Sequence, residues 1–351
     1  MWLLAYALKT FLSQTGHIVE IINFRTENQK DIYAVLTKRK GYRYILKNAY
    51  SMINYCSLNK KHKLFEKFLE VELKCSKEVT SAKQINEMGF DAIIAGSDQI
   101  WNISANDFEW IYFLENISAK KYSYAASCGP VNVESKSKTR IATNLDKFEA
   151  ISVRDNSTKK FVENNSSKEA TVVCDPVMLL DKDAWGTLGE QSLKYRLPNK
   201  YIFFYTLSCD KRMKKIVQQM SKELNLPIVL PHNTNQNDLF ISAKRVLVSG
   251  PKEFLYLIKE SSIVVTSSFH AMLFSIIFNK TFYIIDGMKD NRKRDILSYY
   301  HLEKQSIDEE IDFKLIHEQS EHSNMDFSAV RNEQYNSGIK FIKERILHEN
   351  M

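Results

Sequence analysis

The sequence has 351 residues, a length that predicts two domains of ordinary size. Hydrophobic residues make up 44% and charged residues 26% of the chain, and with only 10 Gly and 6 Pro this composition excludes a low-complexity or disordered protein. The formal charge of +7 is a mild excess that fits an anionic substrate or an anionic membrane surface, and because no zinc-finger or RNP-type motif accompanies it, a nucleic-acid partner is not expected.

The five cysteines are odd in number and none of them is at C-x-x-C spacing, which indicates free thiols in a reducing compartment. No apolar run approaches the roughly 18 residues of a membrane helix. The apolar first residues lack the basic leader of a signal peptide. We therefore expect a cytoplasmic protein. The basic run at 60–63 is typical of a solvated helix start, but it also fits peripheral contact with anionic lipid at the inner membrane.

Helices and short apolar strands alternate along the first half of the chain. Residues 2–15 have apolar positions at helical spacing, and Gly16 follows as a helix stop. Because a doubly wound domain normally opens with a strand, we expect the natural first strand and its loop to be missing. A strand over 17–24 and an amphipathic helix over 59–74 come next. Four short strands, each leading into polar residues, are predicted at 91–95, 122–126, 148–153 and 171–174.

The second half repeats this alternation. Its predicted strands cover 200–207, 227–230, 245–248, 263–266 and 281–285. Its predicted helices cover 211–224, 251–260, 271–278 and 326–348. The fold class is therefore α/β, with two Rossmann-like domains facing each other across a cleft and a C-terminal helix. We place the domains at 1–185, 186–325 and 326–351, with a polar connector at the first boundary. In such sheets ligands bind beyond the carboxyl ends of the strands.

The segment Gly96-Ser-Asp-Gln-Ile-Trp-Asn102 follows a predicted strand and has two interpretations. In the first, it is a turn in which Asp98 accepts local hydrogen bonds and Trp101 fills the core. In the second, it is an acceptor-binding loop, whose carboxylate and amide groups hold sugar hydroxyls while the indole stacks on a sugar ring. The residue types alone leave both interpretations open.

Five segments together resemble the signatures of the polysaccharide pyruvyl transferase family. They are Gly96–Asn102, Tyr124–Gly129, Ser152–Asp155, Asp175–Leu180 and Thr266–Ala271, in matching order and spacing, and the resemblance covers most of residues 3–300. It implies a GT-B-like fold, the two-Rossmann arrangement of many glycosyltransferases. It also implies an enzyme that transfers pyruvyl from phosphoenolpyruvate to a sugar of a surface polysaccharide, such as an exopolysaccharide or capsule, or of its lipid-linked precursor. The product is a cyclic ketal. No metal and no cofactor besides the donor are expected.

The donor is a dense anion, and its transfer requires protonation of the methylene carbon. Histidine is the side-chain type suited to proton transfer near neutral pH, and arginine is suited to binding phosphate and carboxylate. The resemblance implies that His270 contacts phosphoenolpyruvate and donates the proton, and that Arg154 binds the donor. The alternatives are a structural histidine and an ion pair of Arg154 with Asp155.

This chain has Ser268 where several family members have arginine. We expect Arg292 to supply the missing cation, with a solvated basic stretch as the alternative. The helix that follows Ser267 and Ser268 is also expected to offer backbone N–H groups to a phosphate.

On the acceptor side, Asp98 is the expected base or hydroxyl orienter. The other expected acceptor contacts are Ser97, Gln99, Trp101, Asn102 and Ser127. Two other functions remain open. A nucleotide-sugar glycosyltransferase would need a phosphate-binding loop, and the second half has no Gly-rich one. A catalytically inactive glycan-binding relative is favoured by Ser268 and by the unusual N-terminus.

Overall fold

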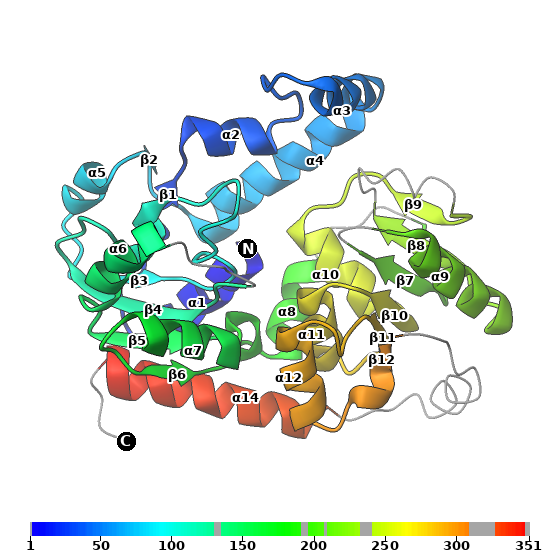
Figure 1. Ribbon diagram of the computed structural model, residues 1–351. Coiled ribbons are helices and arrows are strands. Elements are labelled where there is room, and N and C mark those ends of the chain that lie inside the picture. Colours follow the sequence, from blue (N-terminus) through cyan, green and yellow to red (C-terminus); the bar gives the residue numbers. More distant parts are fainter. Residues whose placement is uncertain are drawn as a thin grey trace. The chain divides into compact units, whose positions relative to one another are not determined.

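In the computed structural model, the chain is described over residues 2–129, 135–190, 196–206, 209–231, 241–308 and 327–347 (Figure 1). It divides into two compact units. Unit 1 comprises Met1–Asn59, Glu66–Leu179 and Gln334–Met351, and unit 2 comprises Lys60–Phe65 and Leu180–Glu333. Each unit is built on a parallel sheet, which confirms the predicted α/β class.

The main sheet of unit 1 has four parallel strands in the order β3-β4-β5-β6. Their bounds are Ala92–Ala95 (β3), Lys120–Ala126 (β4), Ala150–Val153 (β5) and Ala170–Val172 (β6). All four were predicted from their apolar runs. The predicted strand over 17–24 is wrong except at its end. Only Asn23–Phe24 (β1) pairs, with Glu78–Val79 (β2), and the preceding residues are largely exposed.

The helices of unit 1 begin with α1 (Trp2–Gln14), whose buried positions have the predicted helical spacing. Gly16 follows it at φ +85°, as expected of a helix stop. The other α-helices are α2 (Glu27–Tyr33), α3 (Tyr42–Ile53), α4 (Tyr55–Lys67, shared with unit 2), α5 (Ala82–Asn86), α6 (Ser135–Leu145) and α7 (Asn156–Asn165). A π-helical turn over Phe68–Leu73 continues α4, so the predicted helix over 59–74 exists but begins earlier.

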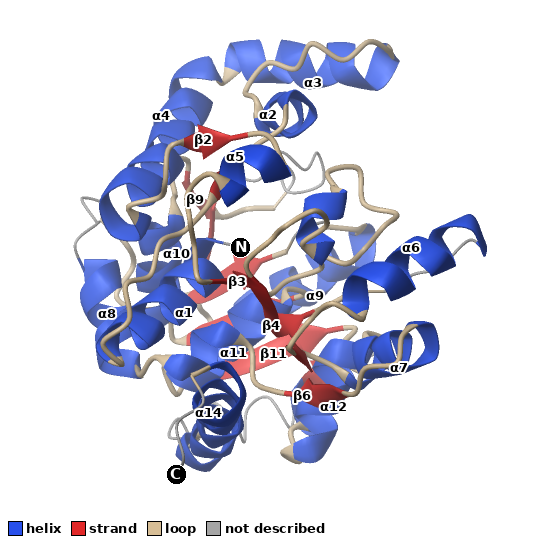
Figure 2. Ribbon diagram, turned by 90° about the vertical axis from the view of Figure 1, so that its left-hand side faces the viewer, coloured by secondary structure: helices blue, strands red, loops and turns tan. Residues whose placement is uncertain are grey.

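Unit 2 contains a six-stranded parallel sheet in the order β12-β11-β10-β7-β8-β9. The strands are Ile202–Tyr205 (β7), Ile228–Pro231 (β8), Lys244–Val246 (β9), Ile263–Thr266 (β10), Thr281–Ile285 (β11) and Ser306–Ile307 (β12). The bounds of β10 and β11 match the prediction because both are continuous apolar runs, fully buried in the sheet. Figure 2 shows the strands of the two units in red among blue helices.

The helices of unit 2 are α8 (Lys182–Glu190), α9 (Lys211–Glu223), α10 (Pro251–Lys259), α11 (Phe269–Ile277) and α12 (Asn291–Tyr299). The segment predicted as a polar connector contains α8, which Asp181 caps by accepting hydrogen bonds from the N–H groups of Asp183 and Ala184. Trp185 on α8 is fully buried and packs edge-to-face on Phe274. The units therefore divide before α8, whereas the predicted boundary at 185/186 lies inside it.

The C-terminal helix α14 (Ser328–Phe341) continues as a π-helical turn over Ile342–Ile346. Residues 326 and 348 of the predicted helix lie outside the described residues. Gly338 is buried where α14 meets the unit 1 sheet, and a Cβ at this position would lie 2.6 Å from Cys174 Sγ and against the hydroxyl of Tyr124. All five cysteines are free, as predicted.

We predict that Gly338→Ala destabilises the protein, although alanine favours a helix by about 1 kcal/mol over glycine. The added methyl group overlaps buried atoms, and overpacking of this kind costs about 1–3 kcal/mol. A urea titration should show a lower free energy of unfolding for Gly338→Ala. The matched control is Asn336→Ala, at an exposed position of the same helix, which should be neutral or stabilising. Equal stability of the two variants would contradict the close packing of α14.

Candidate functional site

Three charged side chains meet at the carboxyl ends of the unit 1 strands. Asp98 follows β3, Arg154 follows β5 and Asp175 follows β6. Arg154 donates from Nη1 to Asp175 Oδ2 at 2.9 Å and from Nη2 to Asp98 Oδ1 at 3.5 Å. The side chains of Arg154 and Asp175 are 2% and 1% exposed, whereas that of Asp98 is 32% exposed. We call these three residues the ion triad, and Asp98 is its solvent-accessible end.

The ion triad gives Arg154 two carboxylate partners. Burial alone would lower the pKa of its guanidinium, but the charges of Asp175 and Asp98 outweigh burial and raise that pKa. The guanidinium therefore stays charged, and its charge is already balanced by the two carboxylates. Arg154 donates to Asp98 and so holds it in place. Donor binding by Arg154 stays a prediction.

Asp98 has an unusual backbone. Its φ of +80° is rare for a non-glycine residue, although Asp and Asn tolerate this region better than most. The next turn of chain is fixed to β4, because Asp98 forms a bridge with Ala126 and the N–H of Ser127 donates to the Asp98 carbonyl at 3.0 Å. Asp98 Oδ1 also accepts from the N–H of Gln99 at 3.0 Å. The strained residue is therefore the one whose carboxylate points to solvent.

Ser127 and Asp155 form a separate buried pair. Ser127 is fully buried and its hydroxyl donates to Asp155 Oδ2 at 2.8 Å, while Asp155 Oδ1 caps α7 by accepting from the N–H of Thr158 at 2.8 Å. Ser127 is buried and bonded within the protein, so its expected contact with substrate stays a prediction. The hydrogen bonds of Asp155 go to Ser127 and α7, whereas Arg154 donates to Asp175 and Asp98.

Trp101 is a core residue, so the expectation that its indole stacks on a sugar is corrected. Its side chain is 0% exposed, lies on Phe113 with ring centroids 5.4 Å apart, and donates from Nε1 to the Tyr112 carbonyl at 2.9 Å. Asn102 Oδ1 accepts from the N–H of Ser104 at 3.1 Å, which closes a local turn. Of the two interpretations of this segment, the turn with a core tryptophan therefore describes its second half.

The first half of the same loop carries polar side chains. Ser97 is 8% exposed, and within the described part of the chain its Oγ has no hydrogen-bond partner. A buried hydroxyl of this kind usually has a partner, so it is a candidate for binding a ligand oxygen. The Gln99 side chain lies against Gly129, where a Cβ would be 2.9 Å from its Cδ. The structure thus groups Ser97, Asp98 and Gln99 on one loop.

In unit 2, the residues predicted for the donor lie between β10 and α11. Ser268 caps α11: its Oγ accepts from the N–H of Ala271 at 3.4 Å, and its own N–H donates to Thr266 Oγ1 at 2.9 Å. The N–H of Ser267 donates to the Tyr205 carbonyl at 3.3 Å. His270 is half-exposed in the first turn of α11, with its ring 5.5 Å from that of Phe269.

Arg292 lies beside this turn. Its guanidinium carbon is 5.7 Å from the centroid of the Phe269 ring, and its Nε and Nη2 donate to the two carboxylate oxygens of Asp290 at 3.2 and 2.8 Å. The Phe269 ring therefore lies near both the His270 ring and the Arg292 guanidinium. The structure also adds two residues that the sequence reasoning missed. Asp290 caps α12, and Lys293 is 8% exposed with Nζ 3.9 Å from Asp290 Oδ2.

Asp290, Arg292 and Lys293 form a group with more basic than acidic side chains, whereas the ion triad has more acidic than basic side chains. Burial alone would raise the pKa of the Asp290 carboxyl, but hydrogen bonds from Arg292 and the charges of Arg292 and Lys293 outweigh burial and lower it. Burial lowers the pKa of Lys293. One carboxylate thus faces two basic side chains, and the group has a surplus of positive charge. The only sequence signal for it was the run Arg292-Lys293-Arg294.

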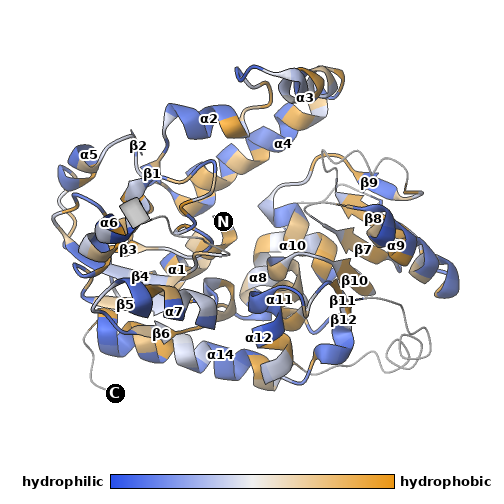
Figure 3. Ribbon diagram, in the orientation of Figure 1, coloured by the Kyte–Doolittle hydropathy of each residue, from blue (hydrophilic) through white to orange (hydrophobic). Residues whose placement is uncertain are grey.

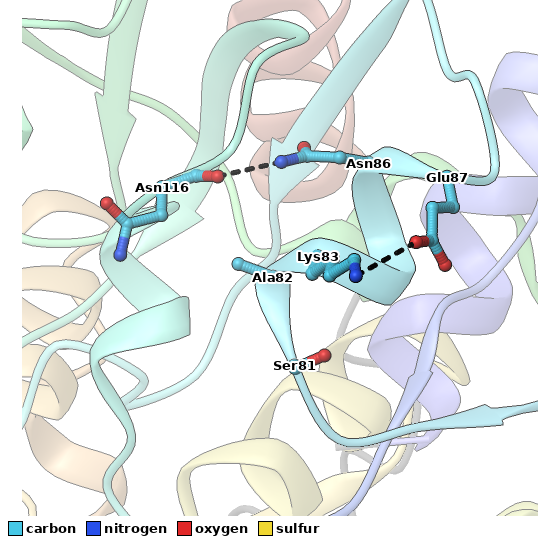
Figure 4. A pocket seen from close by; sticks show the side chains of 6 residues that line it. All are labelled: Ser81, Ala82, Lys83, Asn86, Glu87 and Asn116. Carbon is cyan, nitrogen blue, oxygen red and sulfur yellow. Dashed lines mark hydrogen bonds and ion pairs between the residues drawn. The ribbon is translucent and has the colours of Figure 1, made fainter.

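A pocket of about 670 Å³ lies elsewhere in unit 1, around α5, and holds none of the predicted site residues (Figure 4). Its lining residues bond to each other, as Asn86 does to the Asn116 carbonyl at 2.9 Å, so we assign it no role. Within the described ranges, no group of three or more His, Cys, Asp or Glu side chains could hold a metal ion. No helix in those ranges has the length and apolar character needed to cross a membrane.

Comparisons with known proteins identify both a family and a fold. A family model described as polysaccharide pyruvyl transferase matches residues 3–287. A sequence comparison with curated proteins finds no match. Among solved structures, the UDP-GlcNAc 2-epimerase from Methanocaldococcus jannaschii is similar with a TM-score of 0.52 and 11% identity, covering 99% of this chain and 96% of that chain. The UDP-GlcNAc 2-epimerase from Neisseria meningitidis is similar with a TM-score of 0.51 and 12% identity, covering 99% of this chain and 97% of that chain. These likenesses show the fold alone, and they confirm the predicted GT-B-like class.

We predict that Asp175→Asn lowers the free energy of unfolding by about 3 kcal/mol, because removing one partner of a buried ion pair leaves an under-compensated charge. Urea or thermal unfolding measures this change. Asp91→Asn is the matched control, since Asp91 is exposed in the same unit and should change stability by less than about 0.5 kcal/mol. If both variants have the stability of the wild type, the ion triad does not support unit 1.

Proposed function

Because this chain belongs to the polysaccharide pyruvyl transferase family, we propose that it transfers the pyruvyl group of phosphoenolpyruvate to a sugar of a surface polysaccharide or its lipid-linked precursor. The observation that carries the proposal, beyond family membership, is the position of His270 after β10, next to Phe269, whose ring Arg292 of the positively charged group contacts. A proton donor beside cations is what an anionic enol phosphate requires.

The proposed reaction can be written so that its atoms and protons balance. Protonation of the methylene carbon converts it to a methyl group and leaves a cationic centre at the adjacent carbon. One sugar hydroxyl attacks that carbon and loses its proton. A second hydroxyl of the same sugar then forms the other C–O bond as the bond to phosphate breaks, and its proton leaves with the phosphate. The product is a cyclic ketal plus inorganic phosphate, with no oxidant or further cofactor needed.

We assign the donor steps to residues of unit 2. His270 gives a proton to the methylene carbon. Arg292 and Lys293 stabilise the phosphate and carboxylate charges, and Asp290 holds Arg292 in a fixed orientation through two hydrogen bonds. The N-terminus of α11, next to His270, adds a favourable dipole for an anion. These groups replace the arginine that several family members have at the position of Ser268.

We assign the acceptor steps to residues of unit 1. Asp98 orients an acceptor hydroxyl and takes its proton, because it is the exposed carboxylate of the ion triad. Arg154 is a positioning residue that fixes Asp98 from behind. Ser97 and Gln99 supply further hydrogen bonds from the same loop. A donor that is a central metabolite places this reaction in the cytoplasm, and a lipid-linked acceptor would bring it to the membrane face.

We predict that His270→Asn lowers phosphate release from phosphoenolpyruvate by about 100-fold or more, because it removes the general acid. The assay uses a panel of free and lipid-linked sugar acceptors. The matched control is His301→Asn. His301 is exposed at φ +55°, a conformation that Asn tolerates, and this variant should keep wild-type turnover.

Three outcomes would contradict this proposal. Equal turnover by the two histidine variants would remove the role of His270. Turnover with a nucleotide sugar in place of phosphoenolpyruvate would make the protein a glycosyltransferase. Sugar binding without turnover of either donor would make it a glycan-binding relative.

We also predict that Asp98→Asn lowers acceptor-dependent phosphate release by about 100-fold or more while the protein stays folded. Asn suits the positive φ of this position, so the backbone should be kept while the base is lost. Asp91→Asn again serves as the control. If Asp98→Asn turns over at the rate of that control, the proton acceptor is a different group.

A further inference from the structure

Helix α3 has its apolar side turned toward solvent. Among the described residues, eight of the thirteen exposed large hydrophobic side chains lie between Tyr33 and Tyr55. Within α3, Tyr42, Ile45, Met52 and Ile53 are 74%, 66%, 68% and 84% exposed. Single exposed hydrophobic side chains are ordinary on protein surfaces, but a contiguous group of them indicates a binding surface.

The exposed positions follow the period of the helix. They are three or four residues apart and so form one face, which we call the α3 stripe: Tyr42, Ile45, Leu46, Ala49, Met52 and Ile53. Figure 3 shows orange, hydrophobic residues along α3. At a rise of about 1.5 Å per residue, this 12-residue helix is about 18 Å long.

The opposite side of α3 is polar and faces the protein. Ser51 is 2% exposed. The Asn48 side chain accepts from the N–H of Thr37 at 3.0 Å and donates to the Thr37 carbonyl at 2.9 Å, and Lys47 donates to the Ile32 carbonyl at 3.3 Å. The usual orientation of a surface helix is therefore reversed. Polar bonds to residues 32–37 hold α3 so that the α3 stripe stays outside.

The sequence around the α3 stripe is rich in basic residues. Between Asp31 and Tyr55 it contains no Asp or Glu and five basic residues: Lys38, Arg39, Lys40, Arg43 and Lys47. Arg39 is paired with Asp31, and Lys47 is turned to the Ile32 carbonyl. Lys38 and Lys40, just before the helix, are exposed. An outward apolar face flanked by the exposed cations Lys38 and Lys40 complements an anionic lipid surface. A two-fold contact between copies would instead bring two sets of like charges together.

We propose that α3 docks on the surface of an anionic lipid bilayer, lying in the interface with the α3 stripe among the acyl chains and Lys38 and Lys40 at the headgroups. This inference does not depend on pyruvyl transfer, and it can be tested without any substrate. A protein held at a bilayer would meet lipid-linked sugars there.

The test is co-sedimentation of the full-length protein with vesicles. Wild-type protein should bind vesicles made of equal parts phosphatidylglycerol and phosphatidylcholine, bind pure phosphatidylcholine weakly, and be released by added salt. The double variant Ile45→Gln, Ile53→Gln should lose binding by about tenfold or more, because it removes apolar area from the interface. Lys38→Gln, Lys40→Gln should lose about tenfold on the anionic vesicles alone.

Ile18→Gln is the matched control, since Ile18 is fully exposed in unit 1 outside α3 and should leave vesicle binding unchanged. The substituted residues are exposed, so unfolding curves should coincide for all of these variants. Four results would overturn the proposal. The wild-type protein does not bind the anionic vesicles, or it binds neutral vesicles equally well. The Ile18→Gln variant loses as much vesicle binding as the double isoleucine variant. The wild-type protein forms a dimer that the Ile45→Gln, Ile53→Gln substitutions dissociate, so the α3 stripe contacts a second copy.

Discussion

The buried ion pair between Arg154 and Asp175 is the interaction on which the functional end of unit 1 depends. It links the carboxyl ends of β5 and β6, and Arg154 reaches on to Asp98 after β3. Taking these charges out of water is costly, so each of them requires the others to be in place. Asp175 also accepts from the N–H of Val177, which starts the turn that packs on α1. The same carboxylate therefore supports a helix on one side and the position of Asp98 on the other.

The two charged groups differ in a way that suits the proposed chemistry. The ion triad has two carboxylates and one guanidinium, and its exposed member is a carboxylate. The group beside His270 has one carboxylate and two basic side chains. A negatively charged group orients neutral hydroxyls and takes protons from them, whereas a positively charged group attracts an anionic donor. This contrast is the physical basis for assigning the acceptor to unit 1 and the donor to unit 2.

The sequence predicted most of the sheet because continuous apolar runs such as 263–266 and 281–285 belong to strands buried on both faces. It also located the polar clusters at strand ends. It did not predict how side chains in those clusters point. Arg154 pairs with Asp175 and Asp98, far from it in the chain, because the order of strands in the sheet brings them together. Trp101 stands in a polar loop, and only the packing on Phe113 reveals that it is buried. No helix was predicted over residues 42–53, where α3 lies. Helical spacing would show only that such a helix is amphipathic, because the bonds of Asn48 and Lys47 decide which side is exposed.

The most direct measurement of the proposed activity follows a label from donor to product. The protein is incubated with phosphoenolpyruvate carrying carbon-13 in all three carbons and with a lipid-linked sugar acceptor, and the glycan is analysed by mass spectrometry while phosphate is counted. The proposed function predicts that one labelled three-carbon unit enters the glycan for each phosphate released, and that His270→Asn abolishes both. Phosphate release without label in the glycan, or glycan modified only when a nucleotide sugar is supplied, would contradict it.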